Sequence, residues 1–203
     1  MSKLYFIYAP MQSGKSAALL MRAHSFLENG IPILCIKPSM DTRNGDSVIW
    51  SRIGIQMECL SFDQTDDIFG IINEYCLNMD AMGQKSPKWI LCDESQFLTS
   101  GQVDELSRIV DELGINVICY GLRSDFTGHL FEGSKRLFEL ADDIEEMKVT
   151  CSCGKKAIIN ARLNIDGNIV TDGEVVGIEG EYRYKPMCRR CYKHKTQFVN
   201  ENQ

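Results

Sequence analysis

Long hydrophobic runs, an excess of positive charge and internal repeats are all missing from this 203-residue sequence. Because no apolar segment approaches the roughly 20 residues that span a membrane, no contact with a membrane is expected. The net charge of −6 disfavours nonspecific binding to nucleic acid, which needs a surplus of Lys and Arg on at least one face. A strand-like segment begins almost at Met1 and leaves no room for a signal peptide, so a cytoplasmic location is expected.

Cysteine, in contrast, is plentiful. Nine cysteines make an odd number, and without a signal peptide they favour reduced thiols over a disulfide framework. Five of them lie within apolar segments and are expected to pack as small buried side chains: Cys35, Cys59, Cys76, Cys92 and Cys119. The other four are clustered late in the chain and need a separate explanation.

A phosphate-binding loop is predicted directly after the apolar residues 4–8. In the pattern G-x-x-x-x-G-K-[ST], backbone N–H groups at a helix N-terminus surround a phosphate chain, the Lys adds charge and the Ser ligates Mg²⁺. The matching residues, all expected to bind the nucleotide, are Ala9, Pro10, Met11, Gln12, Ser13, Gly14, Lys15 and Ser16. Ala9 replaces the first glycine, which requires a backbone that tolerates a Cβ there. A coincidental strand, turn and helix is the alternative.

Apolar segments alternate with helical patterns over most of the chain. Buried strands are expected at residues 4–8, 32–37, 89–92 and 116–120, with another beginning at 59, and helices after the phosphate-binding loop, at 66–77 and around 103–113. This alternation predicts an α/β fold with a P-loop-type parallel sheet flanked by helices, which binds its ligand at the carboxyl ends of the strands. The polar residues 39–51 are expected to form a loop.

The character of the sequence changes near Val149, where cysteine pairs and glycine-rich turns begin. We therefore predict three parts: an ATP-binding α/β domain at residues 1–148, a small zinc-binding domain at 149–195 and a flexible tail at 196–203.

Two acids follow the predicted strand at residues 89–92. An acid at the tip of a strand beside the phosphate-binding loop can hold the Mg²⁺ of a bound nucleotide, and Asp93 fits this role. Glu94 could accept the proton of an attacking hydroxyl, as in a kinase, or of water, as in an ATPase. The alternative is that the pair only caps the strand.

The late cysteines form two close pairs, Cys151 with Cys153 and Cys188 with Cys191, separated by 34 residues. This arrangement is typical of a structural zinc ribbon with four thiolate ligands, although the first spacing is short. Zinc would tie together the ends of an intervening segment that has little apolar content of its own. Free thiols and disulfides are the alternatives.

Taken together, these residues resemble the thymidine kinases of the zinc-containing, P-loop type, especially the bacterial branch and its phage-encoded relatives. The resemblance covers residues 4–192. It rests on the motifs K-L-Y-F from residue 3, G-K-S from 14, D-x-R from 41, S-R-I-G from 51, D-E-x-Q-F-L from 93, Y-G-L-R-x-D-F from 120 and Y-x-x-x-C-R from 184.

The resemblance implies that the γ-phosphoryl group of ATP is transferred to the 5′-hydroxyl of thymidine in deoxynucleotide salvage. Glu94 would be the proton acceptor, and Ser16 and Asp93 would hold Mg²⁺. Basic and amide side chains expected near the nucleotide are Arg43, Arg162 and Gln96. A homotetramer is also implied.

The resemblance further implies that a lasso-like loop covers the nucleoside. Its expected residues are Val175, Val176, Gly177, Ile178 and Glu179, with Tyr184 against the sugar and Met11, Phe97, Leu122, Phe126 and Phe131 around the base. Taken alone, each of the three phenylalanines is more often part of a hydrophobic core.

One departure bears on specificity. Relatives have V-I-G-G in the lasso, whereas this chain has G-I-E-G, so Glu179 places a carboxylate beside a base that backbone groups recognise. Two alternatives follow. The chain could prefer another deoxynucleoside, such as deoxyuridine, or it could be a nucleotide-gated zinc-ribbon protein that binds nucleic acid through its locally basic zinc region.

Overall fold

The core of the protein is a six-stranded parallel sheet with the strand order β5-β2-β6-β7-β1-β8. The structure, a computed structural model, describes residues 1–39, 47–173 and 182–200. In sheet order the strands are Leu60–Phe62, Ile33–Pro38, Trp89–Cys92, Asn116–Gly121, Leu4–Tyr8 and Asp143–Glu146. The predicted α/β fold is therefore confirmed.

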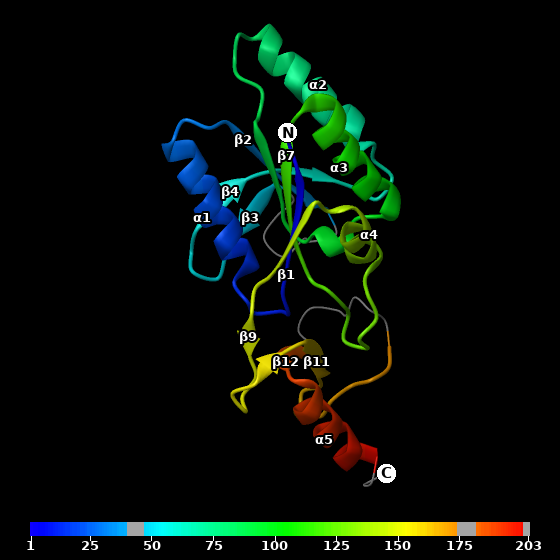
Figure 1. Ribbon diagram of the computed structural model, residues 1–203. Helices are drawn as coiled ribbons and strands as arrows, with labels where there is room; N and C mark the ends of the chain where they lie inside the picture. The colour runs from blue at the N-terminus through cyan, green and yellow to red at the C-terminus, as the bar shows by residue number, and fades with distance from the viewer. Residues whose placement is uncertain (40–46, 174–181, 201–203) are drawn as a thin grey trace.

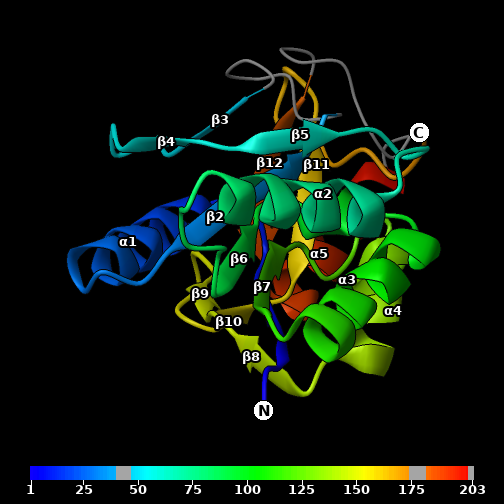
Figure 2. The same ribbon diagram turned by 90° about the horizontal axis from the view of Figure 1, so that it is seen from above.

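Helices cover both faces of this sheet (Figures 1 and 2). On one face lies α1 (Lys15–Glu28), and on the other lie α2 (Ile68–Ala81), α3 (Ser100–Leu113) and α4 (Glu132–Leu140). Side chains alternate along each strand, so Phe6 packs in the core beneath α3 and α4 while Ile7 packs with Leu19 of α1. Each such side chain contributes about 1.5–3 kcal/mol on full burial.

Local signals fix the ends of the helices. The α3 helix begins with a capping box, in which the Thr99 side chain accepts from the Gln102 N–H and the Gln102 side chain accepts from the Thr99 N–H. It ends at Gly114, whose φ of 69° is left-handed and favours glycine. Asp67 caps α2 by accepting from the Gly70 N–H.

Several elements differ from the sequence-based expectation. Within the expected loop 39–51, Val48–Trp50 form β3, which pairs antiparallel with β4 (Gln56–Glu58). The expected flexible tail also overlaps regular structure, because α5 (Arg189–Asn200) includes Thr196; residues 201–203 lie outside the described part. Helix α4 and strand β8 were not expected.

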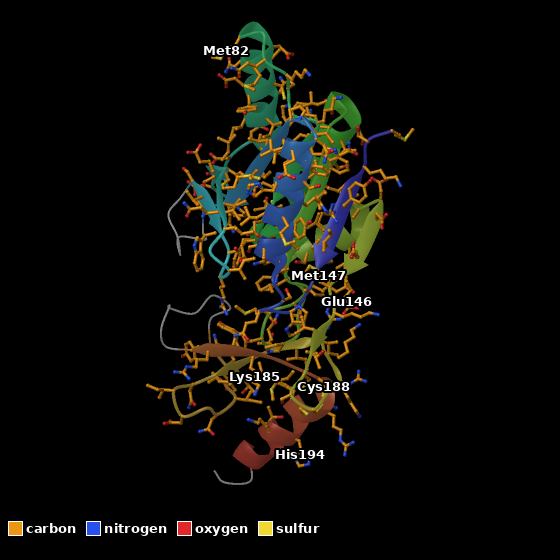
Figure 3. The ribbon with its side chains drawn as sticks, turned by 90° about the vertical axis from the view of Figure 1, so that its left-hand side faces the viewer. Met82, Glu146, Met147, Lys185, Cys188 and His194 are labelled. Carbon is orange, nitrogen blue, oxygen red and sulfur yellow. The ribbon has the colours of Figure 1, made fainter. Side chains whose placement is uncertain are left out.

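A second, smaller layer lies beyond the carboxyl ends of the sheet strands (Figures 1 and 3). It contains two short antiparallel pairs and α5. The pairs are β9 (Val149–Thr150) with β10 (Lys156–Ala157) and β11 (Ile159–Leu163) with β12 (Arg183–Met187). Ala157, Ala161 and Met187 form its apolar core with two of the late cysteines. Among the described residues, no helix is long and apolar enough to cross a membrane.

Candidate functional site

The phosphate-binding loop follows β1 and ends at the start of α1. Ala9 donates its N–H to the Gly121 carbonyl at 3.2 Å, which fixes the loop to the end of the neighbouring strand β7. Gly14 caps α1 with a left-handed φ of 80°. Among the described residues other than glycine, positive φ occurs only at Gln12 and Glu94, so Ala9 has a backbone conformation that accepts a Cβ. The replacement of glycine by Ala9 is thereby explained.

Lys15 lies folded against this loop. Its Nζ donates to the Pro10 carbonyl at 3.2 Å and to Ser13 Oγ at 3.4 Å, and its side chain is buried. These contacts hold the ammonium group at the inner side of the turn. A phosphate chain that entered the loop would therefore meet a positive charge together with the N-terminus of α1.

Asp93 lies buried beside the loop, at the end of β6. The strand β7 separates β6 from β1, yet Ser16 and Lys15 of the loop lie close enough to the Asp93 carboxylate to favour its charged form. Burial, followed by the charge of Glu94, raises the pKa of Asp93 to about 7, although Ser16 and Lys15 act in the opposite direction. Its Oδ1 has no hydrogen-bond partner among the described residues. A buried carboxylate oxygen of this kind, beside a serine hydroxyl, suits a Mg²⁺ ion.

Glu94 is held in place by the following turn of 3₁₀ helix, η1 (Ser95–Phe97). Gln96 Nε2 donates to Glu94 Oε2 at 2.5 Å, and Gln96 Oε1 accepts the Leu122 N–H at 2.9 Å. The buried Gln96 amide thus joins Glu94 to the end of β7. The structure places Gln96 as a support for Glu94, and its predicted contact with the nucleotide stays a prediction.

Two glycines allow this turn to pack tightly. A Cβ at Gly121 would lie 2.6 Å from Ser95 Oγ, and a Cβ at Gly133 would lie 2.6 Å from the Leu98 carbonyl and 2.7 Å from the Ser95 carbonyl. The backbone that carries Glu94 is therefore wedged between β7 and α4. Nothing in the sequence singles out Gly133, because the residues that it contacts lie far away along the chain.

The aromatic residues expected around the base fall into two groups. Phe97 and Phe131 form an edge-to-face pair with centroids 5.9 Å apart, both half-buried, close to the segment that carries Glu94. Phe126 is buried, and the Arg162 guanidinium lies 3.5 Å from its ring centroid. Leu122, also buried, follows β7 directly. Phe97 and Phe131 thus present more accessible ring surface than Phe126 does.

Arg162, on β11, is almost fully buried at 1% exposure. Its guanidinium lies between the rings of Phe126 and Tyr182, and Nη2 donates to the Asp172 carbonyl. Aromatic faces and a carbonyl, both of which favour a guanidinium, thus contact the cation. Its expected role near the phosphates stays a prediction.

The small layer is attached directly to the phosphate-binding loop. Met11 donates its N–H to Asn160 Oδ1 at 2.7 Å, and Gln12 Nε2 donates to the Tyr184 carbonyl at 2.8 Å. Tyr184 therefore lies at the loop, through its backbone. Asn160 was not singled out from the sequence, because as a polar residue in the alternating run I-N-A-R-L it is expected to face solvent, whereas the structure buries it.

The four late cysteines come together as predicted. Their sulfur atoms all lie within 4.8 Å of one another, and Cys153 Sγ is 3.6 Å from Cys188 Sγ. Thiolates around one tetrahedral zinc, with bonds of about 2.3 Å, are separated by about 3.8 Å, so the cluster fits this geometry. No disulfide joins any of the nine cysteines, all of which lie in the described part of the chain. Cys188 lies at the start of α5 (Figure 3), and Gly154 closes the first turn with a φ of 82°.

The remaining predicted site residues lie outside the described residues. They are Arg43 and the lasso residues Val175, Val176, Gly177, Ile178 and Glu179.

Comparison with known proteins agrees with this site. Residues 2–192 match the family model described as thymidine kinase. The thymidine kinase of Enterobacteria phage T4 is 44% identical over 97% of this chain and 98% of its own, and that of Rhodopirellula baltica is 42% identical over 95% and 89%. The solved structure of the replication initiator DnaA is only distantly similar, at 16% identity and a TM-score of 0.39 over 72% of this chain and 40% of its own. The chain belongs to the thymidine kinase family.

Proposed function

We propose that the protein transfers the γ-phosphoryl group of ATP to the 5′-hydroxyl of thymidine, giving thymidine monophosphate and ADP. Membership of the thymidine kinase family supports the reaction. The observation that carries the proposal is the placement of two acids at one strand end. Asp93 lies beside the phosphate-binding Ser16, and Glu94 is aligned by Gln96. One acid is thus available for the metal and the other for the acceptor hydroxyl.

Each side chain has a distinct part in this scheme. Lys15 and the N–H groups of the loop bind the phosphates and balance their charge. Ser16 and Asp93 would hold Mg²⁺, which when bound supplies charge neutralisation on the β- and γ-phosphates. Glu94 accepts the proton of the 5′-hydroxyl while the hydroxyl oxygen attacks the γ-phosphorus and ADP leaves. Gln96 keeps the Glu94 carboxylate in one orientation, which lowers the cost of reaching that geometry.

The nucleoside is proposed to bind between η1 and the small layer. Phe97 and Phe131 offer ring surface for the base. The lasso, which belongs to the part of the chain outside the described residues, would contact the thymine edge. Zinc on the four cysteines would hold the ends of the small layer together as a structural ion. By family resemblance, we also propose a cytoplasmic homotetramer that acts in deoxynucleotide salvage.

The test is ATP-dependent phosphorylation of thymidine by the purified protein, beside deoxyuridine, deoxycytidine and a control without nucleoside. The expected result is product with thymidine at a rate well above the others. A higher rate with deoxyuridine would show that deoxyuridine, and not thymidine, is the preferred substrate. Protein that retains zinc and binds ATP but phosphorylates no nucleoside would refute the kinase proposal.

A further inference from the structure

Asn160 of β11 is a buried carboxamide, 3% exposed, that joins three separate segments. Its Oδ1 accepts the Met11 N–H of the phosphate-binding loop at 2.7 Å. Its Nδ2 donates to the Ser124 carbonyl, after β7, at 2.9 Å. Both donor–acceptor distances are normal for hydrogen bonds, and the side-chain oxygen accepts from an N–H while the side-chain nitrogen donates to a carbonyl.

The bond to Met11 restrains the part of the loop that precedes the phosphate-binding turn. Ala9 is already tied to the Gly121 carbonyl, and Pro10 has no N–H to donate. The Met11 N–H, bonded to Asn160, is the next backbone donor along the chain, and the left-handed turn at Gln12 follows at once. The start of the loop is therefore held between β7 and β11.

We propose that Asn160 is a positioning residue that holds the phosphate-binding loop in its nucleotide-binding conformation, acting through Met11. The identity of the nucleotide rests on the proposed function. The role requires an acceptor and a donor on one short side chain. Alanine would leave the Met11 N–H and the Ser124 carbonyl without this partner inside the protein, and aspartate would add a negative charge beside the phosphates.

A second contact links the same two parts of the molecule. Gln12 Nε2 donates to the Tyr184 carbonyl at 2.8 Å, and Tyr184 pairs with Arg162 in the ladder of β11 and β12. The small layer thus contacts two successive residues of the loop, once through a buried side chain and once through an exposed one. The two contacts differ in burial, which allows them to be tested separately.

The experiment compares Asn160→Ala with Asn164→Ala in the full-length, zinc-replete protein. The Asn164 side chain accepts the Asn168 N–H in the turn that follows β11, so its removal leaves the loop contacts intact. Calorimetric titration with MgATP, without thymidine, gives the Kd, and steady-state assays give separate KM values. For Asn160→Ala we expect the Kd and KM for ATP to rise about tenfold, the order expected for loss of a buried hydrogen bond. Asn164→Ala should match the wild type.

A merely structural role would lower the folded fraction and kcat without changing the Kd of the folded molecules. An unchanged Kd for ATP in folded Asn160→Ala would therefore overturn the proposal. If Asn160→Ala does not fold, Asn160→Leu replaces it: leucine has about the same size and shape but offers no acceptor to the Met11 N–H, so the Kd should again rise. An unchanged Kd in folded Asn160→Leu would then overturn the proposal.

The two proposals fail differently. Wild-type protein that binds MgATP but phosphorylates no nucleoside refutes the kinase activity, while the Kd comparison still decides the role of Asn160. Wild-type protein that binds no MgATP refutes both.

Discussion

Replacing Gly133 by alanine should lower both stability and turnover. The added Cβ would lie 2.6 Å from the Leu98 carbonyl oxygen, 2.7 Å from the Ser95 carbonyl oxygen and 3.1 Å from Leu98 Cβ. The two carbonyl oxygens belong to the backbone and cannot rotate away, so α4 must separate from the segment 95–98. Overpacking of this kind costs about 1–3 kcal/mol. At roughly 2–4 °C per kcal/mol for a chain of this size, the melting temperature should fall by about 2–12 °C.

Turnover should fall as well, because the displaced segment begins directly after Glu94 and includes Gln96. A displacement of about 1 Å at a reacting group reduces the rate by up to about 10²-fold. The readouts are calorimetric melting of the zinc-loaded protein and kcat for thymidine phosphorylation, measured well below the melting temperature so that both proteins are folded.

Gly101→Ala is the matched control. Gly101 lies exposed in α3, where an added Cβ would have its nearest neighbour, Thr99 Oγ1, at 3.9 Å. Alanine should there raise stability by about 0.5–1 kcal/mol, because it is the better helix former. Gly→Ala should thus lower stability at position 133 and raise it at position 101. If Gly133→Ala melts at or above the wild-type temperature, or melts lower with unchanged kcat, the tight contact does not support Glu94 as described.

Three further outcomes are expected. Glu94→Gln should lower kcat by about 10²- to 10⁴-fold, the range for a positioned proton acceptor, with an unchanged Kd for ATP; unchanged turnover would remove Glu94 from this role. The raised pKa of Asp93, about 7 against an ordinary 3.8, means that the folded state binds the proton more tightly, so this group lowers stability as the pH rises from about 4 to 7. Urea unfolding in Mg²⁺-free buffer at pH 8 should therefore show Asp93→Asn to be more stable than the wild type, and equal or lower stability would contradict the raised pKa of Asp93. In a separate titration, Asp93→Asn should fail to bind MgATP. Cys188→Ser should abolish stoichiometric zinc, measured by elemental analysis, and lower the melting temperature; full zinc content in the variant would exclude Cys188 as a ligand.

Much of the sheet could be predicted because its signals are local. The strands before the phosphate-binding loop and before Asp93 are short apolar runs, and α3 has both an apolar face and a terminal glycine. The four cysteines could be grouped from spacing alone, since thiolates in close pairs have few other uses. These features need no knowledge of distant parts of the chain.

The missed elements depend on tertiary contacts. Helix α4 has only nine residues, begins without a side-chain cap and contains Gly133 in its first turn, so its local signal is weak although Glu, Lys, Arg and Leu favour a helix. Its first turn packs closely against the backbone of Ser95 and Leu98, a tertiary contact that adds to this weak signal. Strand β8 has the sequence D-I-E-E, which lacks strand propensity, and is ordered by pairing with β1. The contact between Asn160 and Met11 spans 149 residues and leaves no local trace.

The acidic composition of β8 has a consequence for assembly. As the outermost strand beside β1, it presents open backbone groups on one side, but the exposed Asp143 and Glu145 give it like charges, whereas Glu146 pairs with Lys156. A second copy that tried to extend the sheet there would bring these carboxylates together, which opposes strand addition. At the opposite border, β5 has only three residues. Continuous sheets across subunits are thus disfavoured at both borders, and the proposed tetramer should associate through its helical surfaces.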